Sequence, residues 1–434
     1  MPRHRQYAPL RVFLNNRLVG RLLKQPSGAI QFRYDVSWLE WKNNFPISLS
    51  LPLREKPAHG EIVIAVFENL LPDSTAMKRQ VAEKVGASGT DAYSLLSAIG
   101  RDCVGALQFT PEDTEANMGG TAVNGEIISN DKIADLLKNL KQAPLGLSRE
   151  EDFRISIAGV QEKTALLRYK EKWLRPYGTT PTTHIFKTQI GKLPNGLDLS
   201  NSVENEFYCL KLMEAFSLKV NDAQIQSFAG TKALVIKRFD RLWTKDGRLL
   251  RLPQEDFCQA LSVLPTKKYQ SDRGPGIVNI LDMLKGSDEP EEDRKTVLKA
   301  QILFWLISAI DGHAKNFSIF LKPEGGFSLT PLYDVLTAQP YCDAGQIRHS
   351  HMKLAMAVGD NNHYRIDKIH ARHFMQTGSR AKLPEAITRT AIDEIADQAE
   401  RAMARLEASL PGDFPERIHT SVKAVLFKRL RMLR

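Results

Sequence analysis

The chain has 434 residues, of which 42% are hydrophobic and 25% are charged, as is ordinary for a globular protein with two or more domains. Its net charge of +10 is unusual and predicts a polyanionic partner such as nucleic acid, nucleotide or an acidic protein. The longest apolar run, residues 302–310, is about half a membrane span, and the amino terminus lacks the apolar region of a signal peptide. These features argue against a membrane partner, and we expect a cytoplasmic protein.

The four cysteines lie far apart, and no two of them form a Cys-x-x-Cys pair. Neither a zinc site nor a disulfide framework is therefore predicted, and we expect reduced thiols in the core. The pair His349 and His351 has no carboxylate or cysteine at ligand spacing nearby, so we interpret it as structural or incidental.

The first third of the chain predicts a small α/β module over residues 1–112. Short β-like runs at residues 10–14 and 18–23 precede a helix near residues 62–71, which Pro72-Asp73-Ser74 ends. The polar stretch at residues 111–130 has no periodicity and predicts a linker or mobile loop, and residues 113–150 are assigned to a linker and a helix.

Residues 151–255 return to a β pattern, which we expect to form the nucleotide-binding part of a lobe. Strand, turn and strand are predicted over residues 153–167, with further strands at residues 183–187 and 233–239. A helix at residues 203–216 carries Glu204 and Glu206. Residues 256–434 are predicted to be a mostly helical lobe.

Three residues in this helical part have the spacing of a phosphoryl-transfer centre. In such sites an Asp accepts the proton of the attacking hydroxyl, an Asn five residues later reaches Mg²⁺, and a later Asp binds the metal. Asp311, Asn316 and Asp334 follow this order. Because this spacing also occurs by chance, the assignment of these residues depends on the surrounding sequence pattern.

That surrounding pattern supports a catalytic loop. The apolar stretch at residues 297–310 contains no Gly or Pro and predicts a buried helix that ends at Asp311. Two β-like runs follow at residues 317–321 and 327–332, and the segment between them predicts a hairpin. Helix, base, hairpin and metal-binding Asp is the order of parts in the catalytic half of a protein kinase.

A phosphoryl-transfer site also needs a cation on the phosphates and a loop that covers them. Lys187 ends a β run as the lysine of Val-Ala-Ile-Lys does in protein kinases, and Glu206, or alternatively Glu204, could pair with it. The covering loop would be residues 156–163, which hold one glycine and depart from Gly-x-Gly-x-x-Gly. On spacing alone this segment does not predict a phosphate loop.

Several of these segments resemble the HipA family over residues 10–425. The matching motifs include residues 153–167, Thr180-Pro181-Thr182-Thr183-His184-Ile185-Phe186-Lys187, Arg251-Leu252-Pro253-Gln254-Glu255-Asp256, residues 311–318, and residues 67–74 and 99–106 of the first module. The resemblance implies a bacterial serine/threonine kinase toxin of a type II toxin–antitoxin system. The fold class implied is α+β, a bilobal protein-kinase-like fold with a β-rich first lobe, an extra module and a helical second lobe.

Carried onto this sequence, the resemblance makes Asp311 the catalytic base and Asn316 and Asp334 the Mg²⁺ ligands. It implies ATP contacts by the loop Ala158, Gly159, Val160, Gln161, Glu162 and Lys163, by Lys187, by the adenine segment Lys237, Arg238 and Phe239, and by His313, Ala314, Lys315, Asn316 and Tyr333. It also implies that Ser156 is phosphorylated by another copy of the kinase, and that the phosphate expels the loop and stops activity.

The resemblance further implies two kinds of macromolecular partner. The first is a helix-turn-helix antitoxin, a HipB-like dimer that brings the kinase to operator DNA, with Arg380 and Lys382 as candidate phosphate contacts. The second is the protein substrate, expected to be glutamate–tRNA ligase.

Two other functions fit parts of the sequence. Asp311, His313 and Asn316 also match the loop of phosphoinositide kinases, for which residues 420–434 offer an amphipathic helix. A terminal helix packed on its own lobe explains that segment equally well. The other alternative is a DNA-binding corepressor without activity, which would need neither ATP nor Asp311.

Overall fold

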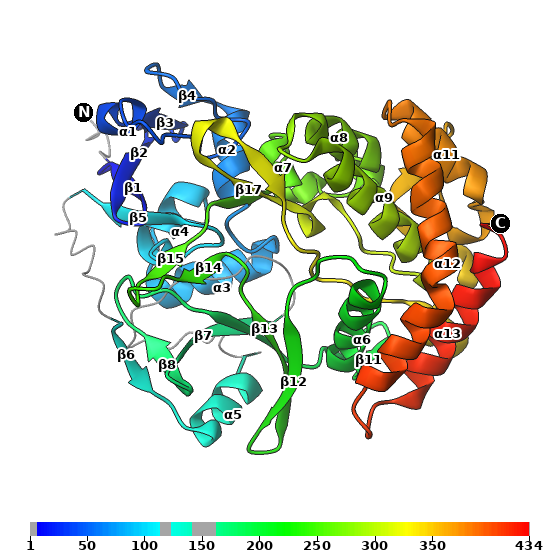
Figure 1. Ribbon diagram of the computed structural model, residues 1–434. Coiled ribbons are helices and arrows are strands. Elements are labelled where there is room, and N and C mark those ends of the chain that lie inside the picture. The colour runs from blue at the N-terminus through cyan, green and yellow to red at the C-terminus, as the bar shows by residue number, and fades with distance from the viewer. Residues whose placement is uncertain (1–6, 113–122, 141–161, 434) are drawn as a thin grey trace. The chain divides into compact units, whose positions relative to one another are not determined.

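The computed structural model describes residues 7–112, 123–140 and 162–433 (Figure 1). They divide into two compact units. The first unit holds the described residues of 1–188, 226–266 and 320–326, and the second holds those of 189–225, 267–319 and 327–434. The fold is α+β, as predicted, with the large sheets mainly in the first unit and a mostly helical second unit. The four-part division of the chain at residues 112, 150 and 255 stays a prediction.

The first unit begins with a five-stranded antiparallel sheet in the order β4-β3-β2-β1-β5. Its strands are β1 (Leu10–Leu14), β2 (Arg17–Lys24), β3 (Ile30–Tyr34), β4 (Ala58–His59) and β5 (Leu107–Pro111). Asn15 and Asn16 both have positive φ, of 45° and 72°, which suits a two-residue turn between twisted strands. The two strands predicted here are thus confirmed.

Four helices lie between β3 and β5 in the chain: α1 (Val36–Leu39), α2 (Glu61–Glu68), α3 (Thr75–Val85) and α4 (Ala92–Ile99). Helix α2 confirms the helix predicted at residues 62–71 but ends earlier. The Leu70 amide donates to the Phe67 carbonyl, and the Leu71 amide donates to the Glu68 carbonyl. The chain therefore tightens into a turn before Pro72. Helix α3 starts at the cap Ser74, whose side chain accepts from the Met77 amide.

A second sheet of six strands has the order β12-β13-β9-β7-β8-β6. The strands are β6 (Gly125–Ile127), β7 (Lys163–Tyr169), β8 (Lys172–Pro176), β9 (His184–Lys187), β12 (Ala223–Phe228) and β13 (Thr231–Lys237). Helix α5 (Asn130–Lys138) buries its apolar side in one core with this sheet, including Ile133, Leu137, Trp173 and Phe186. The linker predicted at residues 111–130 is therefore partly wrong, because β6 pairs with β8.

The first unit ends in short elements: β14 (Arg241–Trp243), β15 (Leu249–Arg251), β16 (Gln254–Asp256) and α7 (Phe257–Ala260). Strand β12 crosses the division between the units at residue 225, and β17 (Ser318–Leu321) crosses it at residue 319.

The second unit contains α6 (Ser202–Ala215), α8 (Ile277–Met283), α9 (Pro290–Ile307), α10 (Gln339–Asp343), α11 (Ala371–Arg380), α12 (Glu385–Ser409) and α13 (Glu416–Leu430). Its strands are β10 (Gly191–Lys192), β11 (Asp198–Leu199), β18 (Phe327–Leu329), β19 (Lys353–Val358) and β20 (His363–Arg365). Strands β17 and β18 are neighbours in one sheet, which confirms the predicted hairpin.

Helix α9 is the core of this unit, and every residue from Val297 to Ile307 is buried. It packs against α12 and α13, which lie beside it (Figure 1). Among the described residues, no helix is both long enough and apolar enough to cross a membrane.

Candidate active site

The carboxyl end of α9 positions the loop that carries Asp311. Ser308 ends the helix in the left-handed conformation, with φ of 59°, and its hydroxyl donates to Gln339 Oε1 at 2.7 Å. The buried Arg429 guanidinium donates from Nη1 to the carbonyls of Trp305 and Leu306, at 2.7 and 3.1 Å. A cation on the last carbonyls satisfies the helix end and complements its dipole. Burial lowers the pKa of Arg429 to about 10, so it stays charged at neutral pH.

The Asp311 loop is held by its own backbone and by one tyrosine. The His313 amide donates to the Asp311 carbonyl at 2.8 Å, and the Asn316 amide donates to the His313 carbonyl at 2.9 Å. Asp311 itself is exposed, as a base that meets a substrate hydroxyl must be. The Tyr269 hydroxyl donates to Asp311 Oδ1 at 2.6 Å and so fixes the orientation of the carboxylate.

Asn316 joins the Asp311 loop to the Asp334 loop. Its Nδ2 donates to the carbonyl of Asp311 at 3.3 Å and to that of Asp334 at 3.1 Å. Because both amide protons face backbone carbonyls, the Oδ1 atom is the side chain's acceptor, as a metal ligand requires. The structure thus brings together the three residues predicted to hold the base and Mg²⁺.

The Asp334 loop has a constrained backbone. Asp334 has φ of 58°, a conformation that costs energy for a residue with a side chain and recurs at functional sites. Asn205 of α6 holds the loop, since its Nδ2 donates to the Thr337 carbonyl at 2.8 Å and its Oδ1 accepts from the Thr337 amide at 2.9 Å. The Tyr333 hydroxyl donates to the Lys315 carbonyl at 2.7 Å. These contacts fix both loops to one framework.

The described residues contain no cluster of three or more His, Cys, Asp or Glu side chains that could hold a metal. An Asn and one Asp from neighbouring loops, with water and phosphate oxygens, still suit Mg²⁺, which keeps several ligands outside the protein.

In the first unit, two lysines form an unusual pair. Lys163 of β7 and Lys187 of β9 are direct cross-strand partners, and each is 5% exposed. Like charges opposite each other destabilise a sheet unless an anion is bound nearby. Both residues were predicted to contact ATP phosphates, so the register places two predicted phosphate ligands side by side.

The segment predicted to line the adenine begins at Lys237, the last residue of β13. Lys237 is exposed, and the ring of Phe239 stands edge-on to Phe320, with centroids 5.7 Å apart. The Arg238 side chain, by contrast, is 3% exposed and belongs to a buried ion cluster.

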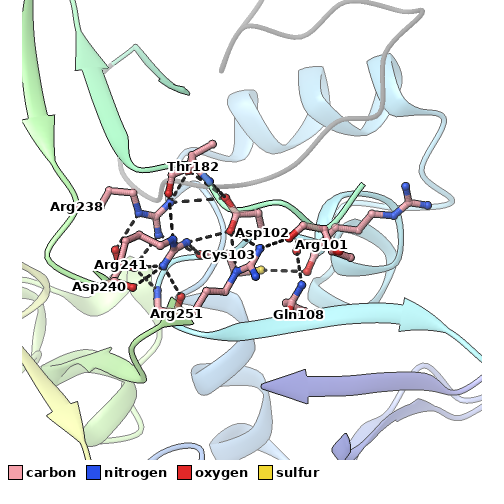
Figure 2. Close-up of polar contacts among 12 residues, drawn as sticks. Arg101, Asp102, Cys103, Gln108, Thr182, Arg238, Asp240, Arg241 and Arg251 are labelled. Carbon is pink, nitrogen blue, oxygen red and sulfur yellow. Dashed lines mark hydrogen bonds and ion pairs between the residues drawn. The ribbon is translucent and has the colours of Figure 1, made fainter. Parts of the chain in front are cut away.

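We define the Asp102 cluster as Asp102, Thr182, Arg238, Asp240, Arg241 and Arg251 (Figure 2). Asp102 Oδ1 accepts from Arg241 Nη2 and from Arg251 Nε, both at 3.0 Å. Its Oδ2 accepts from the amide and the hydroxyl of Thr182, at 3.2 and 3.0 Å. The cluster therefore ties the loop after α4 to the strand that ends at Lys187.

Asp240 is the second anion of the cluster. It accepts from Arg238 Nε and Nη2, at 2.9 and 2.7 Å, and from the Gly105 amide at 2.8 Å. Burial alone would raise the pKa of Asp240, but the Arg238 and Arg241 guanidinium groups outweigh burial and lower it. Three guanidinium groups against two carboxylates leave the cluster with a net charge of +1.

Other predicted residues lie elsewhere. Ser156 and Ala158 to Gln161 are outside the described residues, whereas Glu162 and Lys163 are within them. Arg380 ends α11 and donates to the Gly359 carbonyl at 2.5 Å, and the neighbouring Lys382 is exposed. Glu204 accepts from Gln189 Nε2 at 2.6 Å, and both Glu204 and Glu206 are buried.

Sequence reasoning missed Tyr269, Asn205 and Asp102. Tyr269 is 42 residues from Asp311, Asn205 is 132 residues from Thr337, and Asp102 is 80 residues from Thr182. Asn205 lies between the two glutamates that drew attention to α6, but nothing in the local pattern separates it from a surface amide.

A β-rich unit with the Lys163–Lys187 pair and a helical unit with the Asp311 and Asp334 loops fit a protein of the protein-kinase-like class. The model of the HipA N-terminal domain matches residues 10–110, and that of the HipA-like C-terminal domain matches residues 155–403. The chain belongs to the HipA family of serine/threonine kinase toxins.

Individual relatives agree with this family. The Sinorhizobium fredii protein named "Putative kinase Y4mE" is 32% identical over 92% of this chain and 91% of that protein. The serine/threonine-protein kinase toxin HipA of Shewanella oneidensis is 26% identical over 93% of this chain and 90% of that protein. A solved structure of Shewanella oneidensis HipA with HipB and operator DNA has the same fold, with a TM-score of 0.79, 23% identity and 98% coverage of both chains.

Proposed function

We propose that this chain is the ATP-dependent and Mg²⁺-dependent kinase toxin of a bacterial toxin–antitoxin pair. The observation that carries the proposal is the Asn316 side chain, which bonds the backbone of both Asp311 and Asp334 at 3.3 and 3.1 Å. A base and a metal ligand held in one framework are what phosphoryl transfer to a hydroxyl requires.

Each residue then has a role in the transfer. The Asp311 carboxylate, oriented by Tyr269, accepts the proton of the substrate serine or threonine hydroxyl. Asn316 and Asp334 would hold Mg²⁺, which supplies neutralisation of the charge on the phosphates. The ammonium groups of Lys163 and Lys187 would bind the phosphates.

The remaining predicted contacts complete the nucleotide site. The loop at residues 158–163 covers the phosphates, Lys237 and Phe239 line the adenine, and Arg238 does so through its backbone because its side chain is held by Asp240. His313, Ala314, Lys315 and Tyr333 form the nucleotide side of the base loop.

The proposed substrate is glutamate–tRNA ligase, whose phosphorylation in the cytoplasm would stop translation. The proposed regulators are phosphorylation of Ser156 by a second copy and binding of a HipB-like antitoxin. The net charge of +10 and the HipA–HipB–operator complex of the Shewanella protein support contact with operator DNA, to which Arg380 and Lys382 would contribute.

A lipid substrate loses its support in this structure. Val422, Val425, Leu426 and Leu433, which form the apolar side of the amphipathic carboxy-terminal segment, are all buried, and α13 packs on α6, α9 and α10. Substitution of Asp311 distinguishes the kinase from a DNA-binding corepressor without activity, because the function of such a corepressor should not depend on Asp311.

Two substitutions test the assignment of the base and the metal ligand. Asp311→Asn should lower phosphorylation roughly 10²–10⁴-fold with ATP binding retained, because the amide cannot accept the proton. Asp334→Asn should instead weaken Mg²⁺-dependent binding of ATP, because it removes an anionic ligand.

The measurements are phosphate transfer from labelled ATP to proteins of a cell lysate and calorimetric titration with Mg²⁺·ATP. Asp413→Asn, an exposed aspartate of the second unit, is the matched control and should behave as the parent does. Full phosphorylation by Asp311→Asn would show that Asp311 is not the base.

A further inference from the structure

A cavity of about 700 Å³ lies next to the Asp311 loop within the second unit. Ile310, which directly precedes Asp311, is part of its wall, together with Tyr269, Leu354 and Ala355. Cavities of this size hold small ligands or a few side chains. The cavity is therefore large enough for part of a peptide that has its acceptor hydroxyl at Asp311.

The charged side chains of the cavity are all cationic. Lys353, Arg365 and Lys368 contribute to its wall with His363, and none of the described residues that line it is acidic. Lys353 and Arg365 are exposed and are direct partners across β19 and β20. Cations directly opposite each other destabilise a strand pair, and an anion between them would relieve this cost.

A carboxylate beside the wall compensates for part of this charge. Asp367 accepts from Arg365 Nε and Nη2, at 3.0 and 2.7 Å. The hydrogen bond from Arg365 lowers the pKa of Asp367, and the charges of Arg365 and Lys368 lower it further. The wall itself holds three cations, and Asp367, which is not part of the wall, offsets one of these charges.

Tyr269 connects the cavity to the catalytic base. It lines the cavity, and its hydroxyl donates to Asp311 Oδ1 at 2.6 Å. Its ring also stands edge-on to His313, with centroids 5.0 Å apart. Because an extended chain advances about 3.3–3.6 Å per residue, a side chain a few positions from the acceptor reaches past Tyr269 into the cavity.

The size of the cavity and its wall favour an acidic peptide over nucleic acid. Phosphodiester backbones are bound along extended basic surfaces, whereas here the three cations line one open pocket of about 700 Å³. Ile310, Leu354 and the ring of Tyr364 give the cavity an apolar part, which suits the methylene groups of a glutamate or an apolar neighbour.

We propose that this cavity is the specificity pocket for acidic side chains near the acceptor residue of the protein substrate. Lys353 and Lys368 are the residues that select these side chains. The inference rests on the kinase function proposed above and names the class of substrate segment that this kinase phosphorylates.

The test is a map of phosphorylated sites. The full chain is incubated with Mg²⁺·ATP and either an intact, dephosphorylated lysate or its peptide digest, and the sites are identified by mass spectrometry. We expect Asp and Glu to be enriched about fivefold within four residues of the acceptor, as two partly exposed ion pairs allow. Peptide pairs with Glu or Gln at the enriched position should differ by the same factor in kcat/KM.

The double variant Lys353→Glu, Lys368→Glu should lose this preference and favour lysine at the same position, with ATP hydrolysis in the absence of peptide unchanged. The milder Lys353→Gln should weaken the preference without reversing it. This single variant provides the measurement if the double variant does not fold. Lys428→Glu, an exposed lysine on α13, is the matched control and should keep the preference of the parent.

The outcomes separate the two proposals. If neither lysate nor digest is phosphorylated and ATP is not hydrolysed, the proposed kinase function is wrong, and the proposed specificity pocket is then wrong as well. If sites are phosphorylated without enrichment of acids, or if the double variant keeps the preference, only the inference is overturned. Inhibition by a short oligonucleotide together with no acid preference would also overturn it and would assign the cavity to nucleic acid.

Discussion

Asp102→Asn should destabilise the first unit more than any ordinary surface change. The carboxylate is fully buried and accepts four hydrogen bonds, two from the arginines Arg241 and Arg251 and two from Thr182. An amide of the same shape offers one acceptor atom instead of two, so one pair of donors faces its NH₂ group. The buried net charge also rises from +1 to +2.

The magnitude follows from this geometry. Removing one partner of a buried ion pair costs about 3–5 kcal/mol, because the remaining charge stays in a poorly solvating interior. Total stabilities of domains are about 5–15 kcal/mol, so the variant is expected to lose a large part of its stability at 25 °C. A Thr182 donor left without an acceptor adds to the cost.

The assay is urea unfolding of the parent and the variant, followed by circular dichroism and tryptophan fluorescence. Asp246→Asn is the matched control, since Asp246 pairs with Arg248 at 2.7 Å but is exposed, and it should not shift the midpoint measurably. Arg251→Met should partly rescue Asp102→Asn, because it returns the net charge to +1. A variant as stable as the parent would refute this account of the cluster.

Two further predictions concern Glu255 and Ser156. Burial raises the pKa of Glu255 to about 8, so its contribution to stability is full below the ordinary value near 4.5 and is lost as pH rises through 8. Glu255→Gln should have the same free energy of unfolding as the parent at pH 5 and a free energy higher by a few kcal/mol at pH 9, with a correspondingly higher thermal midpoint. A difference between the two proteins that stays constant from pH 5 to 9 would contradict this. Ser156→Glu should be inactive, and mass spectrometry after incubation with Mg²⁺·ATP should find phosphate on Ser156 of the parent. Full activity of the phosphorylated parent would exclude the switch.

The sequence predicted those parts of the fold in which local pattern and burial agree. The apolar helix at residues 297–310 corresponds to α9, although it ends at Ile307, because Ser308 adopts the left-handed conformation and turns the chain before Asp311. Strand β6 was missed because its three residues, Gly125, Glu126 and Ile127, show no alternation and gain their order from pairing with β8.

In the candidate site, too, some residues could be identified from local sequence patterns and others could not. Asp311, Asn316 and Asp334 lie within 24 positions of each other, and a spacing rule finds them. The cross-strand pairing of Lys163 with Lys187 depends on register, which the sequence of either strand alone does not fix. Tyr269 and Asp102 act over distances of 42 and 80 or more positions, where no periodicity connects the partners.

The Asp102 cluster also sets an order of events during synthesis. Arg251 is made 149 residues after Asp102, which takes roughly 7–30 s at the usual rate of translation. Thr182 and Arg241 are made before Arg251, so Asp102 can accept from them first. Arg251 then supplies the last donor to Asp102 Oδ1. All residues of the Asp102 cluster are therefore synthesised before Asp311, Asn316 and Asp334.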